Sequence, residues 1–144
     1  DSSFRMAISS SKGKVNSYIF TSGSGLNTLE RSWAEKWSKL IGKDYFIQKL
    51  NKTTLTSVVK KFKIQNKIDL LNIDVEGHEI EVLNGSDFKF FRPKIITIEI
   101  HVKKTQDIFK TRVFKILQKN KYELISHYYH TCFFKAVEFE IKTL

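Results

Sequence analysis

The sequence has few of the features that cross-link a small protein or hold it in a membrane. It contains one cysteine, Cys132, so no internal disulfide can form and a disulfide-stapled secreted scaffold is excluded. No apolar run approaches the roughly 20 residues of a membrane-spanning helix, which excludes a spanning protein. A single proline, 28% charged residues and 41% apolar residues argue against disorder. The 144 residues therefore fit one soluble domain, and the lone thiol favours a reducing, cytoplasmic setting.

Arginine is also scarce, which argues against nucleic-acid binding, the function that the net charge would otherwise suggest. The formal charge is +10, and basic chains often bind nucleic acid through phosphate contacts. Only four of the 25 basic residues are arginine, the side chain whose planar fork best suits phosphate and guanine. We therefore expect no specific nucleic-acid partner. A basic module for nucleic acid or another anionic polymer stays the alternative function, and it predicts binding that weakens steeply with salt.

Acidic residues gather in one segment of this basic chain. Between Asp69 and Glu99 there are seven acids and three bases, so the segment carries −4 while the remainder carries +14. Clustered carboxylates can accept protons, orient hydroxyl groups or attract cations. This acidic segment is where we expect the chemistry.

Hydrophobic periodicity predicts alternating strands and helices. Strands are expected at 15–20, 45–50, 68–73, 95–98, 122–125, 128–134 and 136–141, the last two as an antiparallel pair. Helices are expected at 29–40, 56–62, 79–83 and 106–118. The helix at 79–83 ends at Asn84-Gly85, a pair typical of a left-handed cap. The alternation is typical of a parallel α/β sheet with right-handed crossovers, so the fold class is α/β.

Both apolar strands of the acidic segment end in acids. Asp74 and Glu76 follow the strand at 68–73, which reads as a buried strand, and Glu99 and His101 follow the strand at 95–98. Ligands of an open α/β sheet bind outside the carboxyl ends of its strands, and neighbouring strands lie about 5 Å apart. If these two strands are neighbours, Asp74 and Glu99 face the same crevice. Gly77 permits a sharp turn or a close backbone approach beside them.

These residues also have plain structural explanations. An acid before a short helix is often only a cap that satisfies free amide groups. Glu79 and Glu81 are most simply the solvated face of the helix, and Cys132 in a Phe-rich strand indicates a core thiol. Three further histidines show no zinc-ligand spacing: His78, His127 and His130.

One long motif connects the chain to a known family. The run Ile-Asp-Leu-Leu-Asn-Ile-Asp-Val-Glu-Gly-His-Glu-Ile-Glu-Val-Leu-Asn-Gly at 68–85 closely resembles the central motif of FkbM-type methyltransferases. Thr54-Leu55 resembles the family's Thr-Leu before a helix, and Arg-Pro-Lys-Ile-Ile-Thr-Ile-Glu-Ile-His at 92–101 resembles its next strand. Ala7 with Gly13 resembles the family's Ala and Gly after the third strand. The resemblance covers residues 4 to 125.

The resemblance implies an S-adenosyl-methionine-dependent transferase on a Rossmann-like class I sheet with antiparallel strands at its C-terminal end. Such enzymes methylate a hydroxyl of a sugar, glycan or other small metabolite, so a small-molecule or glycan acceptor is the expected partner. The resemblance fixes neither the acceptor nor the oligomeric state.

The resemblance also assigns roles to residues. Asp74 would lie beside the cofactor's methionine end and the acceptor, and Ala7 and Ile8 would lie near the adenine. Asp74 or Glu76 would orient or deprotonate the acceptor hydroxyl, which needs a nearby base because its own pKa is far above neutrality. The far wall of the site would be shaped by Glu99 and His101.

The sequence departs from the family pattern at several places. Asn72 stands where the family usually has Lys, Thr56 where it has Asp, and His78 where a small residue is more common. The family's Gly-rich cofactor turn and its ribose-binding acid have no counterpart in the chain. This predicts that residues 1–144 are one N-terminally truncated methyltransferase domain that is inactive as it stands and holds S-adenosyl-methionine weakly. Metal-dependent hydrolysis through Asp74, Glu76 and Glu99 is the weakest alternative, because hard cations usually take more clustered oxygen ligands.

Overall fold

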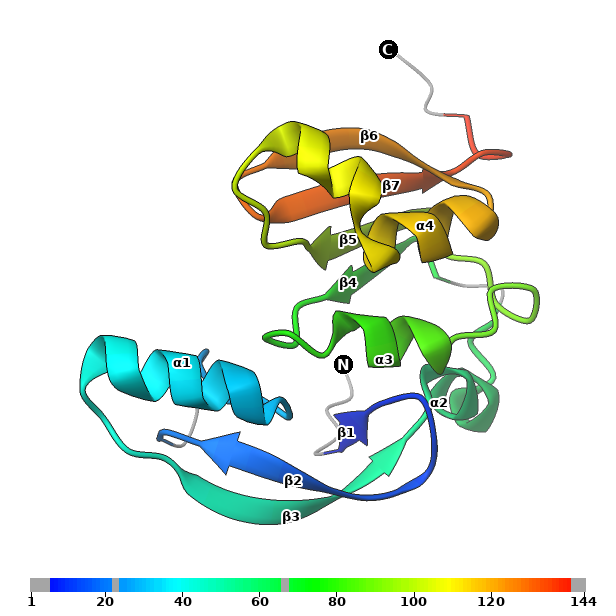
Figure 1. The fold of residues 1–144 in the computed structure, drawn as a ribbon. Coiled ribbons are helices and arrows are strands. Elements are labelled where there is room, and N and C mark those ends of the chain that lie inside the picture. The colour runs from blue at the N-terminus through cyan, green and yellow to red at the C-terminus, as the bar shows by residue number, and fades with distance from the viewer. Residues whose placement is uncertain (1–5, 22–23, 66–67, 141–144) are drawn as a thin grey trace. The chain divides into compact units, whose positions relative to one another are not determined.

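The computed structural model describes residues 6–21, 24–65 and 68–140, and these form two compact units with one sheet each (Figure 1). Unit 1 comprises Asp1–Val58 and Val75–Ser86, and unit 2 comprises Val59–Asp74 and Asp87–Leu144. The α/β class is therefore confirmed as a mixed α/β fold, while the single Rossmann-like sheet stays a prediction. Phe4 and Arg5, at the start of the family resemblance, and Ile141, the end of the last predicted strand, lie outside the described residues.

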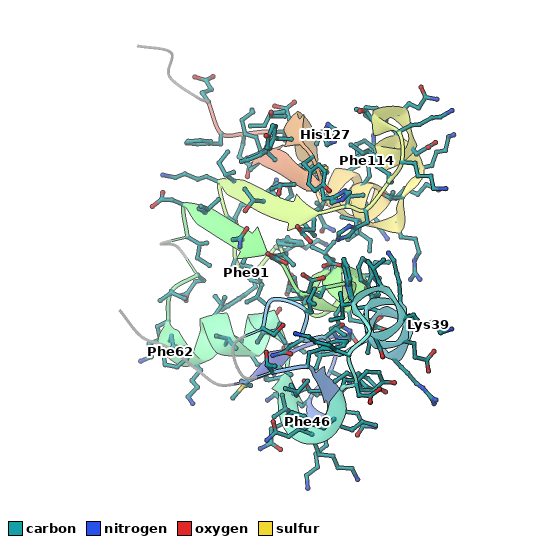
Figure 2. All side chains as sticks on the ribbon, turned by 90° about the vertical axis from the view of Figure 1, so that its left-hand side faces the viewer. Lys39, Phe46, Phe62, Phe91, Phe114 and His127 are labelled. Carbon is teal, nitrogen blue, oxygen red and sulfur yellow. The ribbon has the colours of Figure 1, made fainter. Side chains whose placement is uncertain are left out.

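Unit 1 is built on a three-stranded sheet with the order β1-β3-β2. Strand β1 (Ala7–Ile8) is parallel to β3 (Phe46–Thr53), and β2 (Gly13–Ile19) is antiparallel to β3. Phe46, labelled in Figure 2, opens β3 and is 57% exposed. Helix α1 (Arg31–Ile41) ends at Gly42, whose φ of 64° is left-handed and whose amide donates to the Ser38 carbonyl. The strands predicted at 15–20 and 45–50 are thus confirmed within a few residues.

Unit 2 is built on a four-stranded sheet with the order β4-β5-β7-β6. Strands β4 (Leu70–Ile73) and β5 (Ile95–Glu99) are parallel, and β7 (Thr131–Ala136) is antiparallel to both β5 and β6 (Tyr122–Tyr128). Strands β4, β5 and β6 therefore run in the same direction. Leu70 is 58% exposed, and among the described residues β4 pairs with β5 alone and forms an edge. The prediction of a fully buried strand here was wrong.

The helices are short. Besides α1 they are α2 (Leu55–Phe62), α3 (Glu79–Asn84), the 3-10 helix η1 (Thr105–Lys110) and α4 (Arg112–Lys119). None of the helices in the described ranges is long and apolar enough to cross a membrane. The single helix predicted at 106–118 was wrong, because Thr111 divides it into η1 and α4. The Thr111 hydroxyl accepts the Phe114 amide at 3.2 Å, which caps α4.

The core of unit 2 lies where α4 covers the sheet. Fully buried side chains come from β5 (Ile96 and Ile98), β7 (Cys132 and Phe134) and α4 (Leu117). The rings of Phe114 on α4 and Phe134 lie 6.1 Å apart. Burial raises the pKa of the Cys132 thiol to about 11, so the thiol stays protonated at neutral pH. The prediction of a buried thiol is confirmed.

The predicted antiparallel pair of 128–134 with 136–141 was wrong, although the chain does form an antiparallel pair near its C-terminal end. The two strands are β6 and β7, joined by a turn at Tyr129 and His130. Of the strand predicted at 136–141, Ala136 is the last residue of β7, and no strand is present at 137–140, the rest of its described part. The turn interrupts the run that had been predicted as one strand at 128–134.

Gly85 does not form the left-handed cap that Asn84-Gly85 predicts. Its φ is −85°, so another constraint requires glycine here. A Cβ at this position would lie 2.2 Å from the Ser9 carbonyl oxygen. The Gly85 carbonyl also accepts the Thr56 hydroxyl at 2.9 Å. Gly85 therefore allows α3 to end directly against the backbone that follows β1.

We expect Gly85→Ala to destabilise the protein by about 1–3 kcal/mol, because the added methyl group overlaps backbone that cannot move independently. Urea unfolding followed by circular dichroism measures the effect. Gly25→Ala is the matched control, since a Cβ at Gly25 meets nothing within 4 Å. Equal stabilities for the two variants would contradict the close approach.

Arg92 ties the start of β5 to the residues that flank β6 and β7. Its Nε and Nη2 donate to the Glu138 carboxylate at 2.6 and 2.9 Å. Its Nη1 and Nη2 also donate to the carbonyls of Asn120 and Lys121 at 2.7 and 2.9 Å. The guanidinium lies 4.1 Å from the centre of the Tyr122 ring. The hydrogen bonds that Arg92 donates are the main reason why the pKa of Glu138 is lowered from 4.5 to about 2.

A carboxylate with a lowered folded-state pKa stabilises the fold above its unfolded pKa and loses that contribution as the pH falls through the folded value. We expect the Tm difference between the unaltered protein and Glu138→Gln to be constant above about pH 5 and to disappear toward pH 2. Because Glu138 is 56% exposed, its contribution should not exceed about 1 kcal/mol. Thermal unfolding between pH 7 and pH 2 checks this, and a difference that grows in acid would contradict it.

Candidate functional site

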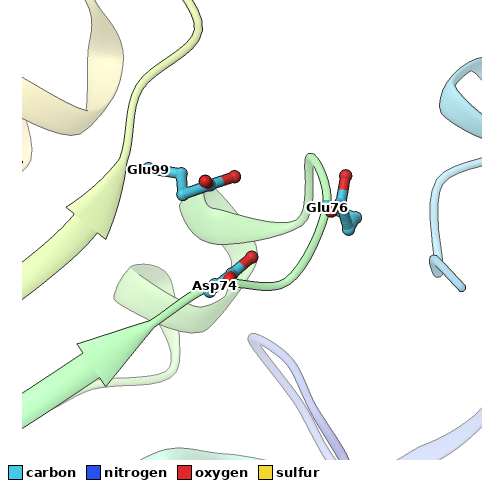
Figure 3. Close-up of side chains that lie close together, drawn as sticks. All are labelled: Asp74, Glu76 and Glu99. Carbon is cyan, nitrogen blue, oxygen red and sulfur yellow. The ribbon is translucent and has the colours of Figure 1, made fainter. Parts of the chain in front are cut away.

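The register of β4 and β5 brings two of the predicted site residues together. Ile73 lies opposite Ile98, so the next residues, Asp74 and Glu99, leave the same edge of the unit 2 sheet (Figure 3). One carboxylate oxygen of Asp74 lies within 4.8 Å of one from Glu99. Asp74 is exposed and Glu99 is half-buried. The condition under which Asp74 and Glu99 were expected to face one crevice, that their strands are neighbours, is therefore met.

His101 extends this acidic edge. Its Nε2 lies 3.0 Å from Oε2 of Glu99, with both side chains about three-quarters buried. The His101 ring packs on His130, with centroids 4.4 Å apart, and His130 packs on Tyr129 at 4.1 Å. Sequence reasoning set His130 aside because it has no zinc-ligand spacing. Its position in a hairpin turn, which the local pattern did not reveal, brings it to the site.

In unit 1, the residues that follow Asp74 form a tight turn. Glu76 and Gly77 have left-handed φ values of 49° and 96°. The Thr28 hydroxyl donates to the Glu76 carbonyl at 2.7 Å. A Cβ on Gly77 would lie 2.2 Å from the Trp33 ring. The requirement for glycine predicted at position 77 is therefore confirmed on two grounds, backbone angle and close packing.

Glu79 accepts hydrogen bonds from the backbone of this turn. The prediction that its side chain lies on the solvated face of the helix was wrong. The residue is only 6% exposed. Its Oε1 accepts the amide of Gly77 at 3.2 Å and that of Val75 at 3.4 Å. Glu81 is also not a simple solvated residue, because it accepts the Ser10 hydroxyl. The acids in the first turn of α3 thus accept hydrogen bonds from the turn before the helix and from the loop after β1.

His78 is a buried connection in the same unit. Its Nδ1 lies 2.6 Å from Oε1 of Glu30, and its Nε2 lies 3.0 Å from the Ser9 hydroxyl. The carboxylate favours the tautomer with hydrogen on Nδ1, which leaves Nε2 to accept from Ser9. His78 therefore joins the turn to the residues before α1 and after β1. Its partners are 48 and 69 positions away, which explains why no local pattern indicated them.

The remaining predicted residues also lie in unit 1. Ala7 and Ile8 form β1, opposite Lys52 and Thr53 of β3. Ala7 is buried and Ile8 is half-buried. Their contact with an adenine ring stays a prediction. The described site residues therefore divide between the units, with Asp74, Glu99 and His101 in unit 2.

We expect Glu79→Ala to destabilise the protein by about 1–3 kcal/mol, because two amides lose their acceptor. Glu79→Gln keeps an oxygen acceptor and should cost less. Hydrogen exchange provides the specific readout: the Gly77 amide should exchange much faster in Glu79→Ala than in Glu35→Ala, the control, which removes an acid from the exposed side of α1. Unchanged protection of Gly77 in both variants would show that Glu79 does not hold the turn.

Comparison with known proteins identifies the family of this chain. The model of the FkbM methyltransferase domain matches residues 1–124, which spans most of both units. No curated protein and no solved structure matched the chain. The family match includes the turn after β4 and the acids that end β4 and β5, the features that the motif at 68–85 and the strand at 92–101 indicated. The chain belongs to the FkbM methyltransferase domain family.

Proposed function

We propose that this protein transfers a methyl group from S-adenosyl-methionine to a hydroxyl group, at the carboxyl edge of β4 and β5. The observation that carries the proposal is the placement of the Asp74 and Glu99 carboxylates side by side at that edge. Ligands of open α/β sheets bind at this end of the strands. Membership of the family supports methyl transfer, and the carboxylates support a hydroxyl as the acceptor, because they can accept its hydrogen bond.

The residues of the chain fit the methionine end and the adenine of S-adenosyl-methionine, while the Gly-rich turn and the ribose-binding acid have no counterpart in the sequence. The exposed carboxylate of Asp74 can accept hydrogen bonds from the ammonium group of its methionine end. In unit 1, the half-buried side chain of Ile8 can contact the flat adenine ring, next to the buried Ala7 in β1. When bound, the sulfonium supplies an electrophilic methyl group. Transfer of that group depends mainly on in-line positioning.

Other residues of the chain bind and orient the methyl acceptor. Asp74 or Glu76 orients the acceptor hydroxyl and takes its proton, which makes the oxygen nucleophilic. Glu99 holds the imidazole of His101 by the 3.0 Å contact, so that the ring keeps one orientation. Glu99 and His101 thereby form the wall of the acceptor site.

We also propose that units 1 and 2 belong to one methyltransferase domain. The backbone passes between the units three times, after Val58, Asp74 and Ser86, and the family match covers residues of both. The parallel β4, β5 and β6 with an antiparallel β7 support a Rossmann-like sheet with antiparallel C-terminal strands. The free Cys132 fits a reducing compartment, and we place the reaction in the cytoplasm.

In protein extended upstream by the family's Gly-rich cofactor turn, we expect Asp74→Asn to lower kcat for methyl transfer by about 10²-fold or more, because the amide cannot take the proton. Release of S-adenosyl-homocysteine, with neutral methyl glycosides as acceptors, measures the rate. Asp69→Asn is the matched control, since Asp69 precedes β4 at its opposite end and pairs with Lys94. The control should retain its rate. An Asp74→Asn variant that is as active as Asp69→Asn would refute the assigned role.

A further inference from the structure

Four large apolar side chains are exposed at one end of unit 1. Helix α1 ends with Leu40 and Ile41, β3 begins with Phe46 and Ile47, and residues 42–45 join the two elements (Figure 1). Because this connection is short, the end of the helix and the start of the strand lie at the same end of the unit. Leu40 is 68% exposed, Phe46 and Ile47 are each 57% exposed, and Ile41 is also exposed. We call these four residues the apolar tip of unit 1.

The packing of unit 1 leaves the apolar tip outside the core. Tyr45, directly before β3, packs edge-on against Tyr18 and Phe20, with ring centroids 5.4 and 5.7 Å apart. Phe46 and Ile47 follow it, and neighbouring residues of a strand point to opposite faces of the sheet. Because both side chains are exposed, both faces of β3 are uncovered at its start. The apolar tip is therefore an uncovered end of the unit, not a single face of its sheet.

Lysines flank the apolar tip. Between residues 36 and 49 the chain has four lysines and one acid, Asp44, so this segment carries +3. The four lysines are all exposed: Lys36, Lys39, Lys43 and Lys49. Lys36 and Lys39 line the same surface depression of α1 as Leu40, which places positive charge beside the apolar tip. None of these lysines forms an ion pair with a described residue, so their charges are available to a partner that carries negative charge.

Apolar side chains flanked by lysines match the surface of an anionic membrane. Leucine, isoleucine and phenylalanine can enter the boundary between headgroups and acyl chains, while lysine ammonium groups stay at the headgroup phosphates. Single-stranded nucleic acid instead takes aromatic rings on which its bases stack, and Phe46 is the one ring of the apolar tip. A stable protein interface uses about 20–30 residues a side, which is more than the apolar tip and its lysines provide.

We propose that the apolar tip and its lysines dock this protein on the surface of a membrane that contains anionic phospholipids. The four apolar side chains enter the interface, and the lysines lie against the lipid phosphates. The contact is peripheral, so it needs no membrane-spanning helix, and it is reversible because a few apolar side chains do not anchor a protein permanently. This inference concerns unit 1 alone and does not depend on methyl transfer.

Vesicle sedimentation with the 144-residue chain tests the docking. The probes are vesicles of phosphatidylcholine alone and vesicles of phosphatidylcholine mixed with phosphatidylglycerol, with inorganic phosphate as a competitor. We expect binding to the mixed vesicles that weakens with salt and is about tenfold or more tighter than binding to phosphatidylcholine alone. Inorganic phosphate should not compete at constant ionic strength. No binding to the mixed vesicles, equal binding to both kinds, or displacement by phosphate would overturn the proposal.

Apolar substitutions separate the apolar tip from the general positive charge of the chain. Phe46→Thr combined with Ile47→Thr should weaken binding to the mixed vesicles about tenfold or more, because two apolar side chains no longer enter the interface. Threonine suits a strand, so the Tm should change little. Phe109→Thr combined with Val137→Thr removes two exposed apolar side chains from unit 2 and should bind normally. Equal affinities of the two double variants would overturn the proposal.

Charge substitutions apply the same comparison to the lysines. Lys39→Gln combined with Lys43→Gln should weaken binding to the mixed vesicles about tenfold and reduce its dependence on salt. Lys115→Gln combined with Lys119→Gln, on α4 of unit 2, changes the net charge equally and should bind normally. The pairs are matched, because Lys39 and Lys119 are each the basic residue in the last turn of their helix. Equal affinities would show that only the net charge matters, which would overturn the proposal.

Two measurements on the same variants test other occupants of the apolar tip. The affinity for single-stranded DNA, measured by fluorescence anisotropy, should be the same with and without Phe46→Thr and Ile47→Thr. The molar mass, measured by analytical ultracentrifugation, should also be the same. Loss of DNA binding or of self-association in this double variant, with vesicle binding unchanged, would assign the apolar tip to nucleic acid or to a second copy of the chain and overturn the proposal.

Discussion

The parallel register between β4 and β5 decides where the acids of this chain lie. Because neighbouring residues on a strand point to opposite faces, a slip by one residue would move Asp74 away from Glu99. A side-chain contact marks the observed register: the Thr97 hydroxyl donates to Oδ1 of Asn72 at 2.6 Å, between residues directly opposite each other. Asn72 is one of the positions where the sequence departs from the family pattern. Asn72 therefore has a hydrogen-bond partner across the strand pair. Because Thr97 is buried, loss of this contact would leave its hydroxyl group without a partner and destabilise the fold.

The turn after β4 shows a second constraint, which acts within unit 1. Gly77 provides the left-handed backbone, the Trp33 ring fills the space that a side chain would need, and Glu79 binds the amides of the turn. His78 fixes the same segment through Glu30 and Ser9. Most of the motif at 68–85 is thus explained by what holds the backbone in place. In our proposal only Asp74 and Glu76, the motif's acids ahead of α3, touch the reactants.

Local patterns predicted the elements better than they predicted the contacts. The strands that became β2, β3, β4 and β5 were found because apolar alternation and flanking turns are local signals. The break at Thr111 was missed because the apolar spacing continues across it, and the role of Gly85 was missed because Ser9 is distant in sequence. Asp74 and Glu99 were expected to meet only if the apolar strands that they follow were neighbours, which the sequence alone did not decide. The burial of Glu79, and the position of His130 beside His101, depend on tertiary contacts that one sequence does not encode locally.

In our proposal, the carboxyl edge of β4 and β5 binds the reactants of methyl transfer. Titration of ¹⁵N-labelled protein with S-adenosyl-methionine tests it most directly, because amide shifts report even weak binding residue by residue. We expect the largest shifts at Asp74 and Val75, with further shifts at Glu99 and Ile100. Shifts confined to other parts of the sheet, or none at saturating concentrations of the donor, would contradict it.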